Sequence, residues 1–218
     1  MPAVETAVAK PKPRWRGRLH QLAFVASVPA GLGLVAAGRG AEARTGAAIF
    51  AVSLAAVYAT SAAYHRRAWS PRAERIMKHL DHSMIFVLIA GTYTPITLLV
   101  LRPAWGIALL SVAWVGCLAG VVLTVICLDR LHRVGMALYL ALGWLGVVAA
   151  PELLRRLGPV ELGLLLAGGV MYTVGAVMLA AGRPALRPAV FGYHEVWHAM
   201  VVTAGACHYA LILLLVRA

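Results

Sequence analysis

The chain has 218 residues, of which 61% are apolar and only 13% are charged, and its mean hydropathy is +0.82. Soluble domains carry roughly a quarter charged residues, so the composition excludes an ordinary soluble domain. The apolar residues come in long blocks separated by short basic segments, which is typical of a multi-pass α-helical membrane protein. A membrane β-barrel would show ~10-residue segments of alternating polarity, and the sequence has none.

The net charge of +12 comes from Lys and Arg residues that lie mainly between the apolar blocks. This distribution indicates topology determinants and anchors for anionic lipid headgroups, so we expect membrane lipids and no nucleic acid as partners. The three cysteines all lie within apolar blocks and show no C-x-x-C spacing. We therefore expect buried structural thiols and neither a disulfide framework nor a thiolate zinc site.

Residues 1–18 are polar and basic, and we expect them to form a disordered cytoplasmic arm. Residues 19–218 then form one transmembrane domain with short connections. The first apolar segment is longer than a signal-peptide core, which favours its retention as a membrane helix. Seven segments are close to the ~20 residues that cross the hydrocarbon core. They are Leu19–Gly38, Thr45–His65, His82–Leu101, Trp105–Leu128, Val134–Ala150, Val160–Ala181 and Tyr193–Val216. The predicted fold class is an all-α integral membrane protein, a bundle of seven transmembrane helices.

The orientation follows from the basic residues in the short segments. Fourteen of the 20 Lys and Arg residues fall in the N-terminal arm and in the second, fourth and sixth connections, which share one side of the membrane. The positive-inside rule then places the N-terminus inside and the C-terminus outside. We expect a multi-pass protein of the cell membrane.

With seven crossings, the end of the second segment and the starts of the third and seventh lie at the same face. They carry His65, Asp81 and the pair His194 and His198. Residues four apart on a helix share a face about 5–6 Å apart at Cβ, so His194 and His198 can bind one ion. His65 is the natural third ligand, and three histidines plus water are a common catalytic zinc set. The predicted cofactor is Zn²⁺.

Two further residues have roles in this predicted site. Asp81 is placed to accept a hydrogen bond from the water and a proton during catalysis. Ser61, one turn before His65, could orient the ring of His65. There are ordinary alternatives: interfacial histidines often bind only headgroups, Asp81 could simply cap the third helix, and Ser61 could be a small packing residue.

Other histidines differ in how well they suit the same site. His79 and His82 form an i,i+3 pair on the same face and could substitute as ligands. His208 lies too deep in the membrane to join them, and we expect it to make a hydrogen bond in the bundle core.

Residues 194–198 read H-E-x-x-H, the zinc-protease signature in which the Glu is the general base. The longer form of the motif fails, because Val201 and Ala204 stand where it requires Gly and His. The 20 residues after His198 contain no Asp or Glu that could serve as a further ligand. We therefore do not expect a protease.

The motifs together resemble the haemolysin III family, bacterial relatives of the progestin and adiponectin receptors within a superfamily that includes alkaline ceramidases. The similar stretches span about residues 18–216, and their order and spacing are specific. They are Ser61-x-x-x-His65, Tyr64–Arg66, Leu80–Ser83, Ala90–Pro95 and Tyr193–His198.

The resemblance implies a seven-helix bundle with a zinc ion near the cytoplasm. His65, His194 and His198 would bind the ion, and Asp81 would hold a water. It also implies hydrolysis of a lipid amide or ester for the superfamily as a whole. It does not require an acid at position 195.

Three functions follow. The first is a zinc-dependent hydrolase of lipid amide or ester bonds. The second is a non-enzymatic membrane regulator or receptor-like protein in which zinc joins two helices. The third is a cytolysin or pore, as the family name implies. The fourth to sixth segments offer few polar residues to line a pore, which disfavours a monomeric channel.

Overall fold

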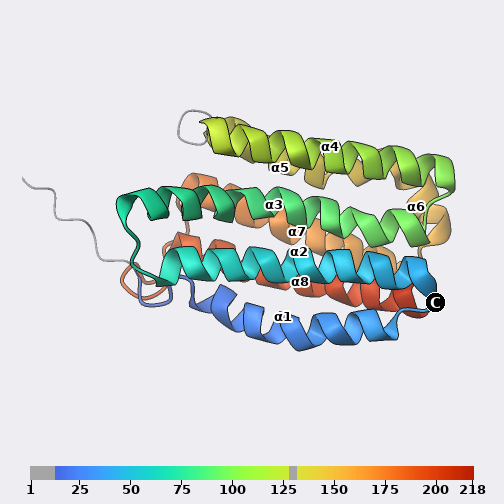
Figure 1. Ribbon diagram of the computed structural model, residues 1–218, viewed down its shortest axis with the longest axis horizontal. Helices are drawn as coiled ribbons and strands as arrows, with labels where there is room; N and C mark the ends of the chain where they lie inside the picture. Colours follow the sequence, from blue (N-terminus) through green and yellow to red (C-terminus); the bar gives the residue numbers. More distant parts are fainter. Residues whose placement is uncertain (1–12, 128–131) are drawn as a thin grey trace, which may run out of the picture.

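The computed structural model describes residues 13–127 and 132–218. Within these two ranges the chain is built from helices that run along one common axis (Figure 1). They are α1 (Arg18–Ala37), α2 (Gly40–Arg66), α3 (Pro71–Leu99), α4 (Pro103–Cys127), α5 (His132–Gly143), the 3₁₀ helix η1 (Leu145–Ala149), α6 (Ala150–Arg156), α7 (Pro159–Ala181) and α8 (Tyr193–Arg217).

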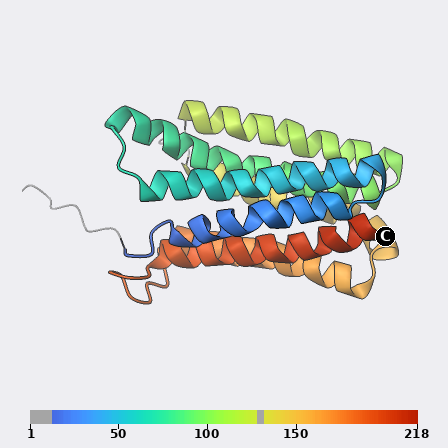
Figure 2. The same cartoon turned by 60° about the horizontal axis from the view of Figure 1, so that its bottom comes forward.

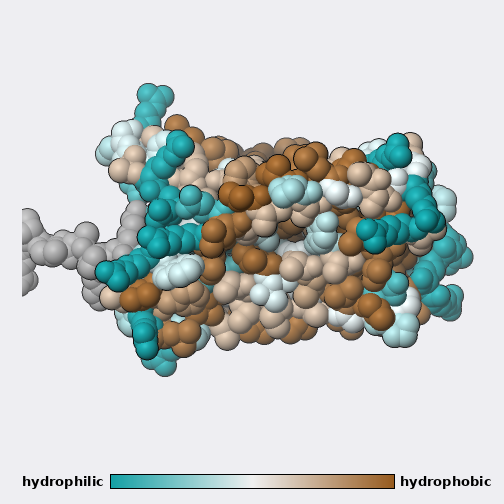
Figure 3. Space-filling view, turned by 90° about the horizontal axis from the view of Figure 1, so that it is seen from below, coloured by the Kyte–Doolittle hydropathy of each residue, from teal (hydrophilic) through white to brown (hydrophobic). Residues whose placement is uncertain are grey.

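Among the described residues, seven helices are long and apolar enough to cross a membrane, and they correspond to the seven predicted segments. The fifth span, Val134–Arg156, joins most of α5 with η1 and α6. A broad apolar belt covers the middle of the molecule, and hydrophilic side chains gather at its two ends (Figure 3). The protein is therefore an all-helical, multi-pass integral membrane protein. The side of the membrane on which each end lies stays a prediction.

The third helix begins earlier than predicted. The apolar stretch begins at His82, but α3 begins at Pro71, and Ser70 caps it by accepting a hydrogen bond from the N–H of Ala73. The stretch between Pro71 and His82 is basic and rich in good helix formers, so the helix continues beyond the apolar region. Asp81 consequently lies three turns inside α3, and the expectation that it could cap this helix is wrong.

The fifth segment is not one continuous helix, as its range Val134–Ala150 had suggested. It breaks between α5 and η1, where the hydroxyl of Tyr93 donates to the carbonyl of Gly143 (2.9 Å) and accepts from the N–H of Gly146 (2.8 Å). A side chain from α3 thus satisfies the backbone groups that the interruption releases, as a break within a membrane requires.

The largest cluster of buried apolar side chains joins α1, α2, α3 and α8, and it contains fully buried side chains such as Leu34, Phe50 and Ile212. Gly91 of α3 lies against Ser53 of α2, where a Cβ would come 2.1 Å from the serine oxygen. Small residues at such crossings let membrane helices approach closely. Helices α4 and α5 lie on the other side of α3 (Figure 1).

The segment before α1 contacts the connection between α7 and α8. The N–H groups of Arg14 and Trp15 donate to the carbonyls of Ala189 and Val190, both at 3.1 Å. The start of α1 therefore lies beside the start of α8, as the second view of the bundle shows (Figure 2). The first twelve residues of the predicted arm lie outside the described ranges.

Candidate metal centre

One end of the bundle, which we call the histidine end, brings together residues from α2, α3 and α8. His65 is in the last turn of α2, and His194 and His198 are in the first two turns of α8. One ring nitrogen from each of the three lies within 4.8 Å of those of the other two. These are the three ligands predicted from the sequence, and they could hold a metal ion.

The arrangement of the three rings fits a single small ion. Nε2 of His65 lies 3.1 Å from Nε2 of His194, and the ring of His198 lies 5.2 Å from that of His65 and 4.6 Å from that of His194, centre to centre. Two nitrogens bound to one tetrahedral zinc at about 2.0–2.1 Å lie about 3.3 Å apart. Moreover, Nδ1 of His198 is buried and has no hydrogen-bond partner among the described residues. The donor set therefore suits zinc, although it does not identify the metal.

Asp81 lies beside this cluster, with its Oδ2 atom 3.7 Å from Nε2 of His65. The side chain of Ser61 is buried, and Ser61 lines the same cavity as Asp81. Ser61 and Asp81 thus face one cavity, whereas the predicted effect of Ser61 on the orientation of His65 stays a prediction. Asp81 therefore lies next to the imidazole cluster, where a reaction of a metal-bound water would need a proton acceptor.

Glu195, the acid of the H-E-x-x-H pattern, is fully buried, but both of its carboxylate oxygens have other partners. Oε1 accepts from the guanidinium of Arg16, and Oε2 accepts from the backbone N–H of Gly192 at 2.8 Å. Glu195 therefore caps the start of α8 and ties it to the segment before α1. This is a structural role, and it removes the general base that a zinc protease would need.

His20 is a fourth histidine of this end, and it was not among the predicted site residues. Its ring stacks on that of His198, with ring centres 3.9 Å apart and an angle of 16° between the planes. Both of its ring nitrogens are buried without a partner among the described residues. The available signal was its position, because His20 opens the first apolar segment on the side to which His65 and His194 were assigned.

Of the other histidines, His82 lines the same cavity as His194, and His79 lies about one turn before it on α3. His79 and His82 are not members of the three-histidine group, and Nδ1 of His82 lies 2.8 Å from the carbonyl oxygen of Lys78 on the preceding turn. His208 is far along α8, where Nε2 lies 3.4 Å from the carbonyl oxygen of Leu165. This is the kind of core hydrogen bond that the sequence led us to expect.

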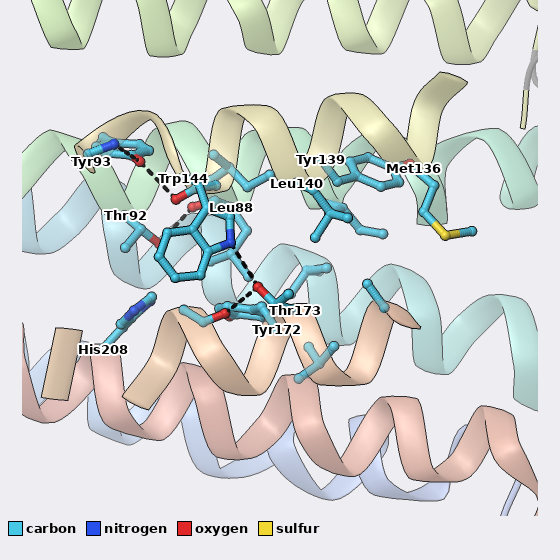
Figure 4. Close-up of a pocket in the computed structure, with 18 of the residues that line it drawn as sticks. Leu88, Thr92, Tyr93, Met136, Tyr139, Leu140, Trp144, Tyr172, Thr173 and His208 are labelled. Carbon is cyan, nitrogen blue, oxygen red and sulfur yellow. Dashed lines mark hydrogen bonds between the residues drawn. The ribbon is translucent and has the colours of Figure 1, made fainter. Parts of the chain in front are cut away.

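A cavity of about 340 Å³ extends from the histidine end into the bundle. Asp81, His194 and His198 line one part of it. Farther along, the lining is mostly apolar and comes from α3, α5 and α7, with a few aromatic and polar side chains among the aliphatic ones (Figure 4). Volumes of this size are typical of small-molecule sites.

Comparison with known proteins agrees with this architecture. The Bacillus cereus protein "Hemolysin-3" is 32% identical over 197 residues, which cover 89% of this chain and 87% of that protein. The "Hemolysin-3 homolog" of Bacillus subtilis (strain 168) is 32% identical over 165 residues, 76% of this chain and 74% of the relative. A more distant match is the "Heptahelical transmembrane protein ADIPOR2" of Oryza sativa subsp. japonica, 30% identical over 180 residues, 75% of this chain and 79% of that protein.

The family model described as "Haemolysin-III related" matches residues 8–209, which is nearly the whole chain. This match and the relatives confirm the resemblance that the sequence motifs indicated. Seven membrane-spanning helices and a cluster of three histidines at one end are thus features of a chain that belongs to the haemolysin III family.

Proposed function

We propose that this protein is a zinc-dependent hydrolase that cleaves an amide or ester bond of a membrane lipid. The observation that carries the proposal is that three imidazoles, a carboxylate and an apolar cavity share one place in the bundle. In the orientation predicted from the basic residues, this site lies near the cytoplasmic face of the cell membrane.

The three histidines would hold the metal through ring nitrogens from two helices, α2 and α8. Bound zinc supplies two effects to such a reaction: it polarises a carbonyl group, and it makes a water molecule more acidic. Neutral imidazoles add no negative charge to the site, so the positive charge of the ion is left for the substrate and the water.

The carboxylate of Asp81 would take the proton from the attacking water and return it to the leaving group. Ser61, which lines the same cavity, would donate a hydrogen bond to this carboxylate and hold it in place. With both Glu195 oxygens engaged elsewhere, Asp81 is the carboxylate that remains, among the described residues near the three histidines, to move a proton.

The cavity would receive the acyl chain. Its lining is rich in leucine and isoleucine, including Leu88, Ile96 and Leu140, so a hydrocarbon chain could enter without exposing apolar surface to water. A cavity that reaches Asp81 and His198 brings a carbonyl at the head of that chain to the reactive groups.

One observation favours a second candidate, a structural metal. His65 and His194 lie 129 residues apart in sequence, and an ion between them would join α2 to α8 directly. Zinc would then stabilise a regulator or receptor-like bundle without catalysis. The haemolytic activity suggested by the names of the Bacillus relatives is a third possibility, to be measured beside hydrolysis.

The test uses the full chain purified in detergent. The metal is removed with a chelator and restored with zinc, and release of fatty acid is followed from an N-acyl sphingoid lipid and from a glycerol ester. Hydrolysis that disappears on chelation and returns with zinc supports the enzyme. A protein that binds one zinc per chain, unfolds more easily without it and hydrolyses neither lipid would overturn the hydrolase and leave the structural metal. Red-cell lysis by the zinc-loaded protein, measured in parallel, would support the third possibility.

A further inference from the structure

The far part of the cavity contains two polar side chains that the proposed reaction does not use. They are His208 of α8 and Tyr172 of α7, and both line the cavity (Figure 4). Their rings lie 5.7 Å apart between centres. His208 lies ten residues beyond His198 on the same helix, which corresponds to about 15 Å along its axis.

The hydrogen bonding of His208 is incomplete. A carbonyl oxygen can only accept, so the contact of Nε2 with Leu165 O at 3.4 Å places the proton of the neutral ring on Nε2. Nδ1 is then left with a lone pair. It is buried, and it has no partner among the described residues. The residue His208 is only 7% exposed, so water outside the bundle does not replace the missing donor.

The hydroxyl of Tyr172 is also buried and also lacks a partner within the described ranges. A phenol can donate one hydrogen bond and accept others. The two neighbouring groups therefore offer a free acceptor, Nδ1 of His208, and a free donor, the O–H of Tyr172. Unpaired polar groups at membrane depth are costly, and they frequently mark functional sites.

The backbone makes room for this arrangement. Gly168 of α7 lies against the imidazole of His208, and a Cβ at position 168 would come 2.3 Å from Nε2. Any side chain there would push the ring away from α7 and from the carbonyl of Leu165. The absence of a side chain at Gly168 thus leaves room for the ring of His208 in this orientation.

We propose that His208 and Tyr172 form a subsite for a hydroxyl group on the hydrocarbon chain of the lipid. An alcohol is the group that matches both partners, because it can donate to Nδ1 of His208 while accepting from Tyr172. An amide N–H could satisfy only the first of them, and an ether or ester oxygen only the second. The substrate class is then a hydroxylated acyl lipid, and this extension rests on the proposed function. With the head at the three histidines, the ~15 Å between sites places the hydroxyl roughly a dozen carbons along an extended chain.

The test measures binding, so it does not depend on hydrolysis. The probes are octadecanoic acid, 12-hydroxyoctadecanoic acid and 2-hydroxyoctadecanoic acid, added to the full chain in detergent. The measured quantity is the ratio of dissociation constants for the plain and hydroxylated acids, compared between wild type and variants so that partition into micelles cancels. We expect Tyr172→Phe to reduce the preference for the 12-hydroxy acid about tenfold, the usual size of an effect from one or two buried hydrogen bonds.

Two comparisons make the result specific. Tyr209→Phe removes the hydroxyl of a tyrosine that donates to Ala30 on α1 and does not line the cavity, and it should leave the preference unchanged. The preference for the 2-hydroxy acid, whose hydroxyl lies near the head, should be the same in wild type and Tyr172→Phe. His208→Leu should resemble Tyr172→Phe, and it serves as the second variant if the first is not recovered folded.

An unchanged preference in Tyr172→Phe and His208→Leu would overturn the subsite and indicate that the two groups hold only water. The subsite would also be overturned if the wild type preferred the 12-hydroxy acid over the plain acid no more than it prefers the 2-hydroxy acid over the plain acid. The outcomes are separable from those of the proposed function. A lost preference without lipid hydrolysis would support the subsite and count against the enzyme, whereas hydrolysis with no preference would do the reverse.

Discussion

The two ends of the bundle both bury ionisable side chains, but they treat them differently. At the end opposite the histidines, Glu152 is buried between Arg102 and Arg156. Arg102 donates to both carboxylate oxygens at 3.0 Å, and Nε of Arg156 lies 2.7 Å from Oε1. This group, the arginine end, leaves the carboxylate fully paired.

At the histidine end, by contrast, several buried ring nitrogens lack partners among the described residues. Imidazoles from α1, α2 and α8 crowd together, and the nitrogens of His20 and Nδ1 of His198 have no partner in the described part of the chain. Three of the rings turn nitrogens towards one another, and Nε2 of His65 lies 3.1 Å from Nε2 of His194. Burial of an ionisable group therefore does not by itself indicate function. The absence of a matching partner is the more informative sign.

The largest expected effect is the loss of metal when a ligand at the histidine end is replaced. His198→Ala removes one of three ligands, so zinc affinity should fall more than 100-fold and the purified protein should lose its metal. Elemental analysis of the protein in detergent measures this. His79→Ala is the matched control, because His79 is near the same end but outside the cluster. Full metal content in folded His198→Ala would contradict the site.

The next effect separates binding from chemistry within the histidine end. Asp81→Asn keeps the size of the side chain but cannot accept the proton, so lipid hydrolysis should fall by about 10²–10⁴ while zinc content is retained. Initial rates of fatty-acid release and metal analysis of the same preparation check both parts. An active Asp81→Asn protein would show that another group accepts the proton.

A smaller effect is expected from the acid that only supports the site. Glu195→Gln leaves Arg16 without its counter-ion at the start of α8, and we expect a loss of about 2 kcal/mol in the free energy of unfolding. Unfolding in SDS, followed by tryptophan fluorescence, measures it. The zinc-loaded variant should still hydrolyse lipid at a rate near that of wild type. A loss of activity comparable to that of Asp81→Asn would restore Glu195 as a candidate base.

The smallest effect is expected at the arginine end. Glu152→Gln should lower stability in SDS less than Glu195→Gln does, because the side chains of Arg102 and Arg156 are 58% and 44% exposed and water can replace the lost partner. Its zinc content and hydrolysis should equal those of wild type. If instead this variant lost metal, the two ends would be coupled through the bundle, and the comparison between them would fail.

Hydropathy and helical spacing predicted much of this molecule. The seven spans follow from long apolar runs, and the grouping of His65, His194 and His198 follows from counting crossings. These predictions succeed because the order of polar and apolar residues along the chain determines the depth of each residue in the membrane.

The order of polar and apolar residues does not determine which helices are neighbours in the bundle. The stacking of His20 on His198 and the contact of Arg16 with Glu195 depend on α1 lying next to α8, and no apolar pattern specifies that neighbour. Likewise, α3 extends to Pro71 because a polar segment can stay helical outside the membrane. The break after Gly143 depends on Tyr93 from another helix. Each of these requires knowledge of which helices touch.

The ion pair between Arg16 and Glu195 also has a consequence for biosynthesis. It joins a segment before the first helix to the last helix of the bundle, and the histidines of α8 are the last of the ligands to be synthesised. If the helices enter the membrane in order, the metal site stays incomplete, with His20 and His65 already in the membrane, until α8 has been inserted. Metal capture would mark the end of insertion, and a ribosome-stalled chain lacking α8 should bind none.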